Sequence, residues 1–516
     1  MRWLLKRFSL ASGATAAALL LNSIGVQAGF TLARASGPTP FTPGCNGAPQ
    51  TGRNFPNAEV EPYVSVNPRN AAHVVGVWQQ DRWSNGGANG LLTGVSRDGG
   101  KTWTRTFAHF SRCAGGNKAN GGDYERASDP WVSFARNGTV HQISLSFDDS
   151  DGNQAVLASR STDGGSTWSE PFTIARDTSL DVALDKETIT ADPRHPRFVY
   201  AVWDRLVGLT STNPKDFFGP AWFSRSTNGG ATWEPARIIF DPGPDAQTIS
   251  NEIVVLPNGT LVNMFTLVLQ AASSLVSPLF VAVMRSEDKG LTWSKPLIVN
   301  SLGTIGITDP KTGQPVRTGD IVPQMAVDPA SGALFIVWQD ARFSGGKRDG
   351  IAFSRSLDGG LTWSAPVQVN KATNVQAFTA SVNVTDDGVI GVTYYDFRKD
   401  TADPATLLTT YFLARSRDGG RTWDETRVAG PFDMLTAPFA RGFFVGDYEA
   451  LGTTGESLLP FFVQANSGNL QNRTDVFAAL SREDQDVAGN DRQEVNARPQ
   501  TVHDLVMTHR EVRSDR

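Results

Sequence analysis

The chain has 516 residues and a formal net charge of −5, with 40% hydrophobic residues, 50 glycines and 29 prolines. It is too long for one small domain and too rich in turn-forming residues for a helical bundle. The acidic balance argues against nucleic acid as a partner, and no segment after the N-terminal stretch is apolar enough to cross a bilayer.

Residues 1–28 have the features of a secretory signal peptide. Arg2, Lys6 and Arg7 give a basic start, a short apolar run follows, and the small residue Ala28 ends the stretch. An uncleaved membrane anchor is the alternative, although the apolar run is shorter than a bilayer span needs. We therefore expect an exported protein, either secreted or periplasmic.

The chain contains two cysteines, Cys45 and Cys113. In an exported protein we expect them to form one disulfide. Two unpaired cysteines are the alternative, because sequence spacing alone does not show that two cysteines meet.

A short polar motif ending in tryptophan recurs six times, at intervals of 60 to 70 residues. The copies read SRDGGKTW, STDGGSTW, STNGGATW, SEDKGLTW, SLDGGLTW and SRDGGRTW, and their third positions are Asp98, Asp163, Asn228, Asp288, Asp358 and Asp418. A repeat of this length predicts a modular, stacked architecture.

Each copy lies between two extended apolar stretches, which is the pattern of a hairpin. Two further strands precede each hairpin, such as EPYVSVNP and HVVGVWQQD before the first copy. Each unit therefore reads as a four-stranded antiparallel meander. After the sixth copy, GDYEALGTTGESLLPFFVQAN and DVFAALS have the spacing of three more strands, without the motif.

These units predict an all-β fold, a β-propeller of four-stranded antiparallel blades spanning residues 55–482. We expect seven blades, with residues 29–54 as an N-terminal segment that could supply the ring-closing strand. Six blades plus an appendage is the alternative. Residues 483–516 are polar and aperiodic, and we expect them to be a disordered or loosely attached tail.

The pattern S-x-D-x-G-x-T-W is the Asp box, or BNR repeat, and six copies at this spacing resemble the sialidase (neuraminidase) superfamily of propellers. The resemblance covers roughly residues 55–482 and implies a propeller fold and glycosidase activity. The same motif also occurs in other glycosidases and in proteins that are not enzymes.

The boxes themselves are expected to be scaffold. A catalytic group is needed at one place, whereas these residues lie at six. Asn228 keeps an acceptor for turn hydrogen bonds but lacks the charge that acid–base or metal chemistry needs. Burying one indole removes about 150–250 Å² from water, which is worth up to roughly 4–6 kcal/mol, so the tryptophans should pack between strands.

Chemistry is therefore expected on the face opposite the boxes, where the long connections lie. A repeated Asp/Arg pattern at the ends of the second strands points to this face: Asp81 with Arg82, Asp204 with Arg205, Asp340 with Arg342, and Asp396 with Arg398. These pairs are either ion-pair staples between blades or a ring of charged groups around a polar pocket.

Residues that break the repeat are the other candidates. The starts of the innermost strands contribute Asp129, Glu187, Glu252, Gln324, Asp447, Tyr448 and Glu449, and Arg441 lies in the link before the last three. Glu187 and Glu252 have an alternative role, since either could pair with a neighbouring arginine.

The resemblance implies specific roles, because sialidases hold the substrate carboxylate with three arginines and use a Tyr nucleophile, an assisting Glu and an Asp acid/base. The matching candidates for substrate binding are Arg205, Arg342, Arg398 and Arg441, with Asp340 and Asp447. The catalytic candidates are Tyr448, Glu187 or Glu252, and Asp129. The Arg-Ile-Pro stretch that usually supplies a sialidase's first arginine is absent, and the first strand reads EPYVSV.

We therefore predict an exported, exo-acting glycoside hydrolase of the sialidase-like type, cleaving terminal sugars such as sialic acid from glycans. We expect a monomer with no cofactor and no metal. A non-catalytic propeller that binds glycans or proteins, and a polysaccharide lyase on the same fold, are the alternatives.

Overall fold

The computed structural model describes residues 29–274 and 276–482. The predicted signal peptide at 1–28 and the predicted tail at 483–516 lie outside the described residues. Among the residues described, four short 3₁₀ turns interrupt a β structure: η1 (Arg112–Ala114), η2 (Pro214–Asp216), η3 (Arg342–Ser344) and η4 (Met434–Thr436). Within the described part of the chain, no helix is long and apolar enough to cross a membrane.

Most strands pair in antiparallel groups of four. In chain order, the first three groups are β2 (Glu59–Asn67), β3 (Asn70–Arg82), β4 (Ala88–Ser96) and β5 (Thr104–Thr106); β6 (Arg126–Phe134), β7 (Val140–Phe147), β8 (Gln154–Ser161) and β9 (Phe172–Asp177); and β10 (Val182–Ala191), β11 (Val199–Val207), β13 (Ala221–Ser226) and β14 (Arg237–Phe240).

The next three groups are β15 (Ala246–Val255), β16 (Leu261–Leu269), β17 (Leu279–Ser286) and β18 (Leu297–Ser301); β21 (Gln324–Val327), β22 (Leu334–Asp340), β23 (Gly350–Ser356) and β24 (Val367–Gln368); and β25 (Ala377–Val384), β26 (Ile390–Asp396), β27 (Leu408–Ser416) and β28 (Asp424–Asp433). The last comprises β30 (Ala450–Thr454), β31 (Ser457–Ala465), β32 (Thr474–Ser481) and β1 (Phe30–Arg34).

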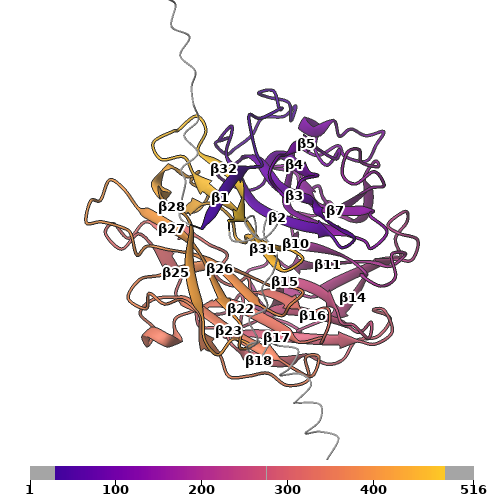
Figure 1. Ribbon diagram of the computed structural model, residues 1–516. Coiled ribbons are helices and arrows are strands. Elements are labelled where there is room, and N and C mark those ends of the chain that lie inside the picture. The colour runs from indigo at the N-terminus through magenta and orange to yellow at the C-terminus, as the bar shows by residue number, and fades with distance from the viewer. Residues whose placement is uncertain (1–28, 275, 483–516) are drawn as a thin grey trace, which may run out of the picture.

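The two ends of the described chain meet in that last group. β1 pairs antiparallel with β32, from Phe30 opposite Ser481 to Arg34 opposite Phe477, and Figure 1 shows the indigo β1 beside the yellow β32. The first strand of each group contacts the first strand of the next, and β30 contacts β2. The fold is an all-β propeller of antiparallel sheets; the number of blades stays a prediction.

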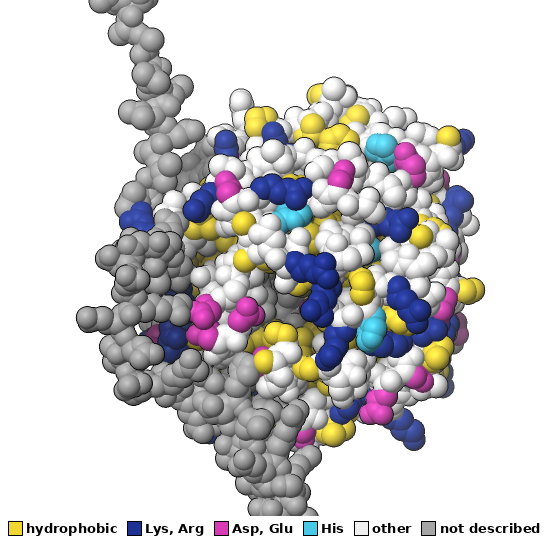
Figure 2. All heavy atoms as spheres, turned by 45° about the vertical axis from the view of Figure 1, so that its right-hand side comes forward, with side chains coloured by type: hydrophobic (Ala, Val, Ile, Leu, Met, Phe, Trp, Pro, Cys, Tyr) yellow, Lys and Arg dark blue, Asp and Glu magenta, His cyan; other side chains and the backbone are white. Residues whose placement is uncertain are grey.

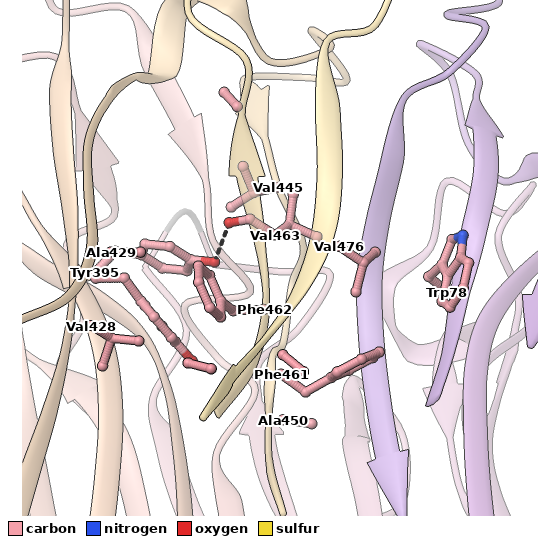
Figure 3. Packing of buried hydrophobic residues seen from close by; sticks show 14 of the residues in the cluster. Trp78, Tyr395, Val428, Ala429, Val445, Ala450, Phe461, Phe462, Val463 and Val476 are labelled. Carbon is pink, nitrogen blue, oxygen red and sulfur yellow. Dashed lines mark hydrogen bonds between the residues drawn. The ribbon is translucent and has the colours of Figure 1, made fainter. Parts of the chain in front are cut away.

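The core lies between neighbouring sheets. Figure 3 shows Tyr395 of β26, Phe461 and Phe462 of β31, and Trp78 of β3 among the buried side chains of one cluster. The Tyr395 hydroxyl donates to the carbonyl oxygen of Val463 at 2.7 Å, so its one polar atom is satisfied inside apolar surroundings. Burial of such large aromatic side chains is the main stabilisation of the fold.

Each box folds as a turn closed by its third residue. The Asp163 carboxylate accepts hydrogen bonds from the amides of Ser166 (3.1 Å) and Thr167 (2.9 Å) and from the hydroxyl of Thr167 (2.6 Å). Asn228 accepts from the Thr232 amide at 3.0 Å, while its own amide donates to the Thr232 hydroxyl at 2.8 Å. The turn therefore forms without a charge.

The box tryptophans pack against the preceding sheet. Ring centroids lie 5.5 Å apart for Trp103 and Phe461, 5.7 Å for Trp293 and Phe223, and 5.1 Å for Trp423 and Phe353. Each of these boxes thus attaches one sheet to its neighbour.

Lys289, which replaces a box glycine, keeps the left-handed φ of 61°. Its ammonium reaches the Asp192 carboxylate of the preceding group at 2.9 Å. The fourth box therefore keeps the turn conformation of the others and adds an ion pair between sheets.

Two further features tie down the connections. Cys45 and Cys113 form a disulfide, with their Cα atoms 4.8 Å apart. The second is a small sheet of β19 (Ile307–Thr308), β20 (Pro315–Arg317) and β29 (Phe443–Phe444), in which β20 runs parallel to β29. Apart from these two features, the short strand β12 (Phe218–Gly219) pairs with β11 and β15. The small sheet joins two long connections that are far apart in sequence.

Candidate active site

The candidate site is a cavity of about 670 Å³ whose residues come from several sheets and from the small sheet β19–β20–β29. Its charged lining residues are Arg82, Asp129, Asp185, Lys186, Arg317, Asp320, Arg441 and Asp447, and its apolar ones include Leu145, Phe147, Leu206, Ile249 and Ile307. No lining residue belongs to a box turn among the residues described. A cavity with an apolar wall and convergent polar groups is typical of a small-molecule site.

Five innermost strands break their pairing register: β2, β6, β10, β15 and β25. Each break contains a non-glycine residue in the left-handed region: Glu61 (φ 52°), Asp129 (φ 50°), Lys186 (φ 48°), Ser250 (φ 65°) and Thr379 (φ 48°). The breaks in β6, β10 and β15 adjoin the cavity, which Asp129, Lys186 and Ile249 line. Such backbone costs about 1–3 kcal/mol per residue, and bulges redirect side chains.

Arg82 and Arg317 share one aromatic ring. Their guanidinium carbons lie 4.8 Å and 4.5 Å from the ring centroid of Phe444. Arg317 Nε donates to both oxygens of Asp447, at 3.0 and 3.1 Å. This pairing fixes Arg317 and the Asp447 carboxylate in a bidentate arrangement.

Arg82 is 2% exposed, and one terminal nitrogen donates to Gln79 at 2.6 Å. Its Nε has no hydrogen-bond partner among the described residues. Burial lowers the pKa of Arg82 to about 10, so the side chain still carries its charge at neutral pH. Arg441, at φ 66°, also lines the cavity, which brings three arginines to one space.

Two carboxyl groups of the cavity have opposite pKa shifts. Burial, followed by the negative charge of Asp129, raises the pKa of Asp185 to about 7. Burial also acts against ionisation of Asp447, but the Arg317 guanidinium outweighs it and holds the pKa of Asp447 below its ordinary value. Burial raises the pKa of Glu61 well above its ordinary value, and this carboxyl is hydrogen bonded to Asp447. Asp185 is therefore still partly protonated near neutral pH, whereas Asp447 is ionised. Glycoside hydrolysis uses such a combination of a protonated and an ionised carboxyl group.

The predicted catalytic residues divide between the cavity and the layer beneath it. Asp129, with Arg441 and Asp447, lines the cavity. Tyr448 is 1% exposed, and its hydroxyl donates to the Pro130 carbonyl at 3.2 Å. Burial raises the pKa of Tyr448 well above its ordinary value. The structure thus places this hydroxyl in the interior, where its proton is donated in a hydrogen bond to a backbone carbonyl.

Glu187 and Glu252 lie deeper in the ring. Glu187 is fully buried, and neither carboxyl oxygen has a hydrogen-bond partner among the described residues. Glu252 lines a second cavity of about 740 Å³, together with Tyr63 and Trp131, and accepts a hydrogen bond from the Met325 amide at 3.2 Å. Burial raises the pKa of Glu252 to about 7. Gln324 lines the same second cavity.

The other predicted arginines do not line the first cavity. Arg205 pairs with Asp177 of the preceding sheet at 2.6 Å. Arg342 pairs with Asp340 at 2.7 Å and donates to Asn300 of the preceding sheet at 2.6 Å. Arg398 pairs with Asp396 at 2.5 Å and with Glu425. In the structure these three side chains are held in ion pairs; the pair of Arg205 links two sheets, as does the hydrogen bond of Arg342 to Asn300.

Sequence reasoning missed four charged residues of the cavity: Asp185, Lys186, Arg317 and Asp320. Arg317 lies in the long connection between β18 and β21, outside the repeated strands, so the repeat did not identify it. Asp185 and Lys186 directly precede Glu187, and all three lie at the register break of β10. Arg82 belongs to the repeated Asp/Arg pattern, but it is the member that enters the cavity.

No family model matches the chain. The sialidase of Micromonospora viridifaciens is 25% identical over 317 residues, which is 55% of this chain and 43% of that protein. The xyloglucanase Xgh74A of Acetivibrio thermocellus is 27% identical over 151 residues, 28% of this chain and 16% of that protein. The chain thus matches less than half the length of these curated relatives.

Among solved structures, an α-L-arabinanase of Penicillium chrysogenum complexed with arabinobiose superposes with a TM-score of 0.46 at 12% identity, covering 88% of this chain and 99% of that one. The sequence match to the sialidase supports the resemblance to the sialidase-like propeller superfamily.

Proposed function

We propose that the protein is a glycoside hydrolase that removes a terminal acidic sugar, of the class to which sialic acid belongs, from a glycan. The observation that carries the proposal is the pair Asp185 and Asp447, whose pKa values are shifted in opposite directions within one cavity. The sialidase and xyloglucanase matches, both by name glycan-cleaving enzymes, support this reaction class.

In this proposal Asp185 is the general acid. Its carboxyl group lines the cavity and retains a proton near neutral pH, so it can protonate the glycosidic oxygen as the bond from the anomeric carbon breaks. The ionised Asp447 stabilises the positive charge that develops on the sugar. Water then adds to the anomeric carbon, and the Asp185 carboxylate takes up the proton that the water loses.

The acidic sugar is inferred from the three arginines. Arg82 lines the cavity and keeps its charge at neutral pH, so its guanidinium group can attract a substrate carboxylate there. Arg317 and Arg441 line the same space. Guanidinium groups suit a planar carboxylate better than lysine does.

We further infer that the protein is exported and that its four-stranded groups form a ring of seven blades. The disulfide between Cys45 and Cys113 supports an oxidising compartment. The contacts of each first strand with the next, and of β30 with β2, support the blade number.

The test is a panel of methylumbelliferyl glycosides, acidic sugars beside neutral ones. We expect turnover of an acidic member, and a large rise in KM for Arg82→Gln. Arg342→Gln is the matched control, because that arginine is held in an ion pair away from the cavity, and it should keep the wild-type KM. Turnover confined to neutral glycosides would overturn the acidic-sugar proposal, and binding without product would favour a non-catalytic propeller.

A further inference from the structure

Phe444 is a buried ring that contacts two arginines of the first cavity. It is 0% exposed, and the guanidinium carbons of Arg82 and Arg317 lie 4.8 Å and 4.5 Å from its ring centroid. Both arginines line the cavity. Cations at such distances are attracted by the π electrons of the ring, most strongly where water is excluded. The ring therefore holds two charged groups of the cavity from behind its wall.

The backbone around Phe444 fixes where the ring lies. In the small sheet, Phe444 of β29 is the parallel partner of Arg317 of β20. Its amide donates to the Pro438 carbonyl at 3.0 Å, and the carbonyl of the next residue, Val445, accepts from the Glu61 amide at 3.1 Å. The ring is therefore attached both to the connection that carries Arg317 and to the first sheet, which supplies the other arginine.

The two arginines differ in their partners other than the ring. Arg317 donates to both carboxylate oxygens of Asp447, so its charge has a counter-ion. Arg82 donates to the neutral side-chain oxygen of Gln79 at 2.6 Å, and no salt bridge of 4 Å or less joins it to a carboxylate among the residues described. A substrate carboxylate is a group that would complete the pairing of this nearly buried cation.

We propose, building on the acidic-sugar hydrolase proposed above, that Phe444 is a positioning residue that holds Arg82 and Arg317 as a carboxylate clamp. A carboxylate has two oxygens, and each can accept from a different guanidinium group when both groups are already in place. Because the ring orders the two side chains beforehand, binding does not carry the entropic cost of immobilising them. The ring itself is buried, so it acts on the substrate only through the arginines.

The experiment measures kcat and KM separately for Phe444 variants, with the methylumbelliferyl glycosides of sialic acid and glucuronic acid as probes. Phe444→Leu keeps an apolar side chain but removes the ring, so KM should rise about tenfold while kcat changes less than about threefold. A series with one, two and three fluorine atoms on the Phe444 ring keeps the ring shape and weakens its attraction for cations. KM should rise stepwise along this series, whereas a ring with only a packing role would leave KM unchanged.

Phe412→Leu is the matched control. Phe412 is 5% exposed, and the guanidinium carbon of Arg398 lies 3.7 Å from its ring centroid, but neither residue is among those that line the first cavity in the described part of the chain. This variant should lose stability and keep the wild-type KM. If Phe444→Leu does not fold, the fluorinated series decides.

The outcomes separate the clamp from the function on which it rests. If the wild-type enzyme cleaves an acidic glycoside and folded Phe444 variants keep its KM, the clamp is overturned and the hydrolase proposal stands. If the wild-type protein cleaves no member of the panel, the hydrolase proposal fails, and calorimetric affinity for free sialic acid and glucuronic acid decides the clamp. Weaker binding by the Phe444 variants than by Phe412→Leu supports it, and equal or absent binding overturns it.

Discussion

The box turns offer a direct comparison between a charged and a neutral residue in the same fold. The Asp163 side chain accepts four hydrogen bonds, from the Ser161 hydroxyl (2.7 Å), the Ser166 amide (3.1 Å), the Thr167 amide (2.9 Å) and the Thr167 hydroxyl (2.6 Å). Asp163→Ala removes all four, whereas Asp163→Asn reproduces the side chain that Asn228 already has in the third box.

The magnitude follows from these bonds. At a net value of about 0.5–1.5 kcal/mol each, reduced because the turn is exposed, the alanine variant should lose about 2–4 kcal/mol of unfolding free energy. The asparagine variant should lose less than about 1 kcal/mol, since Asn228 shows that an amide satisfies the turn. Equilibrium urea unfolding, followed by tryptophan fluorescence, measures both.

The pH dependence has a defined sign. Hydrogen bonds, that from the Thr167 hydroxyl foremost, lower the pKa of Asp163 to about 2. The folded state therefore favours the ionised form, and this contribution is present above the unfolded pKa of about 3.9 and is lost as the pH falls toward 2. Asp163→Asn should lack that acid-side loss.

Two results would refute this account of the boxes. If Asp163→Asn cost as much as Asp163→Ala, the charge and not the acceptor geometry would hold the turn. If a folded Asp163→Ala protein lost its turnover of glycosides, the boxes would take part in the chemistry and would not be scaffold.

Three further predictions concern the site, the disulfide and the core. Asp185→Asn should abolish the alkaline limb near pH 7 in kcat/KM, because the pKa of Asp185 is about 7, and should slow oligosaccharide cleavage more than aryl glycoside cleavage; an intact limb would contradict its role as acid. Replacing Cys45 and Cys113 by serine opens a crosslink across 68 residues and should cost about 2–5 kcal/mol in urea unfolding, with no loss expected if the bond does not form. The pKa of Glu252 is about 7 in the folded state, because burial favours the protonated carboxyl. The free energy of unfolding should therefore fall, by up to the order of 3 kcal/mol, as the pH rises from 4.5 through 7. Glu252→Gln should make this pH dependence less steep, and an unchanged slope would contradict the assignment.

The fold was predictable because its signals are local and repeated. The box turns depend on contacts within four residues of Asp163 or Asn228. The flanking strands are recognisable in the sequence as short apolar stretches. The pairing of β1 with β32 joins residues at opposite ends of the described chain. The sequence indicated this pairing only indirectly, because the last unit lacks a fourth strand of its own.

The site was predictable in part. Asp129, Arg441 and Asp447, which the sequence singled out because they break the repeat, line the cavity. Arg205, Arg342 and Arg398 belong to the same repeated pattern as Arg82, but only Arg82 of these four lines the cavity, so the repeat alone could not tell which member would reach it. Arg317 reaches the cavity only because β20 pairs with β29, a contact between connections that no sequence period encodes.

Figure 2 shows Lys and Arg side chains gathered over the middle of one face, with Asp and Glu side chains scattered around them. The net charge of −5 therefore describes the chain as a whole and not each face. An acidic ligand can approach a molecule of negative net charge where basic side chains predominate locally.

The most direct test of the central claim is the release of methylumbelliferone from glycosides of acidic sugars by the wild-type chain and by Asp447→Asn. The account predicts turnover by the wild-type protein and its loss in the variant, which removes the ionised carboxylate beside Arg317 while the fold persists. No release from any acidic or neutral glycoside by a folded wild-type protein would contradict it, and so would an Asp447→Asn variant as active as the wild type.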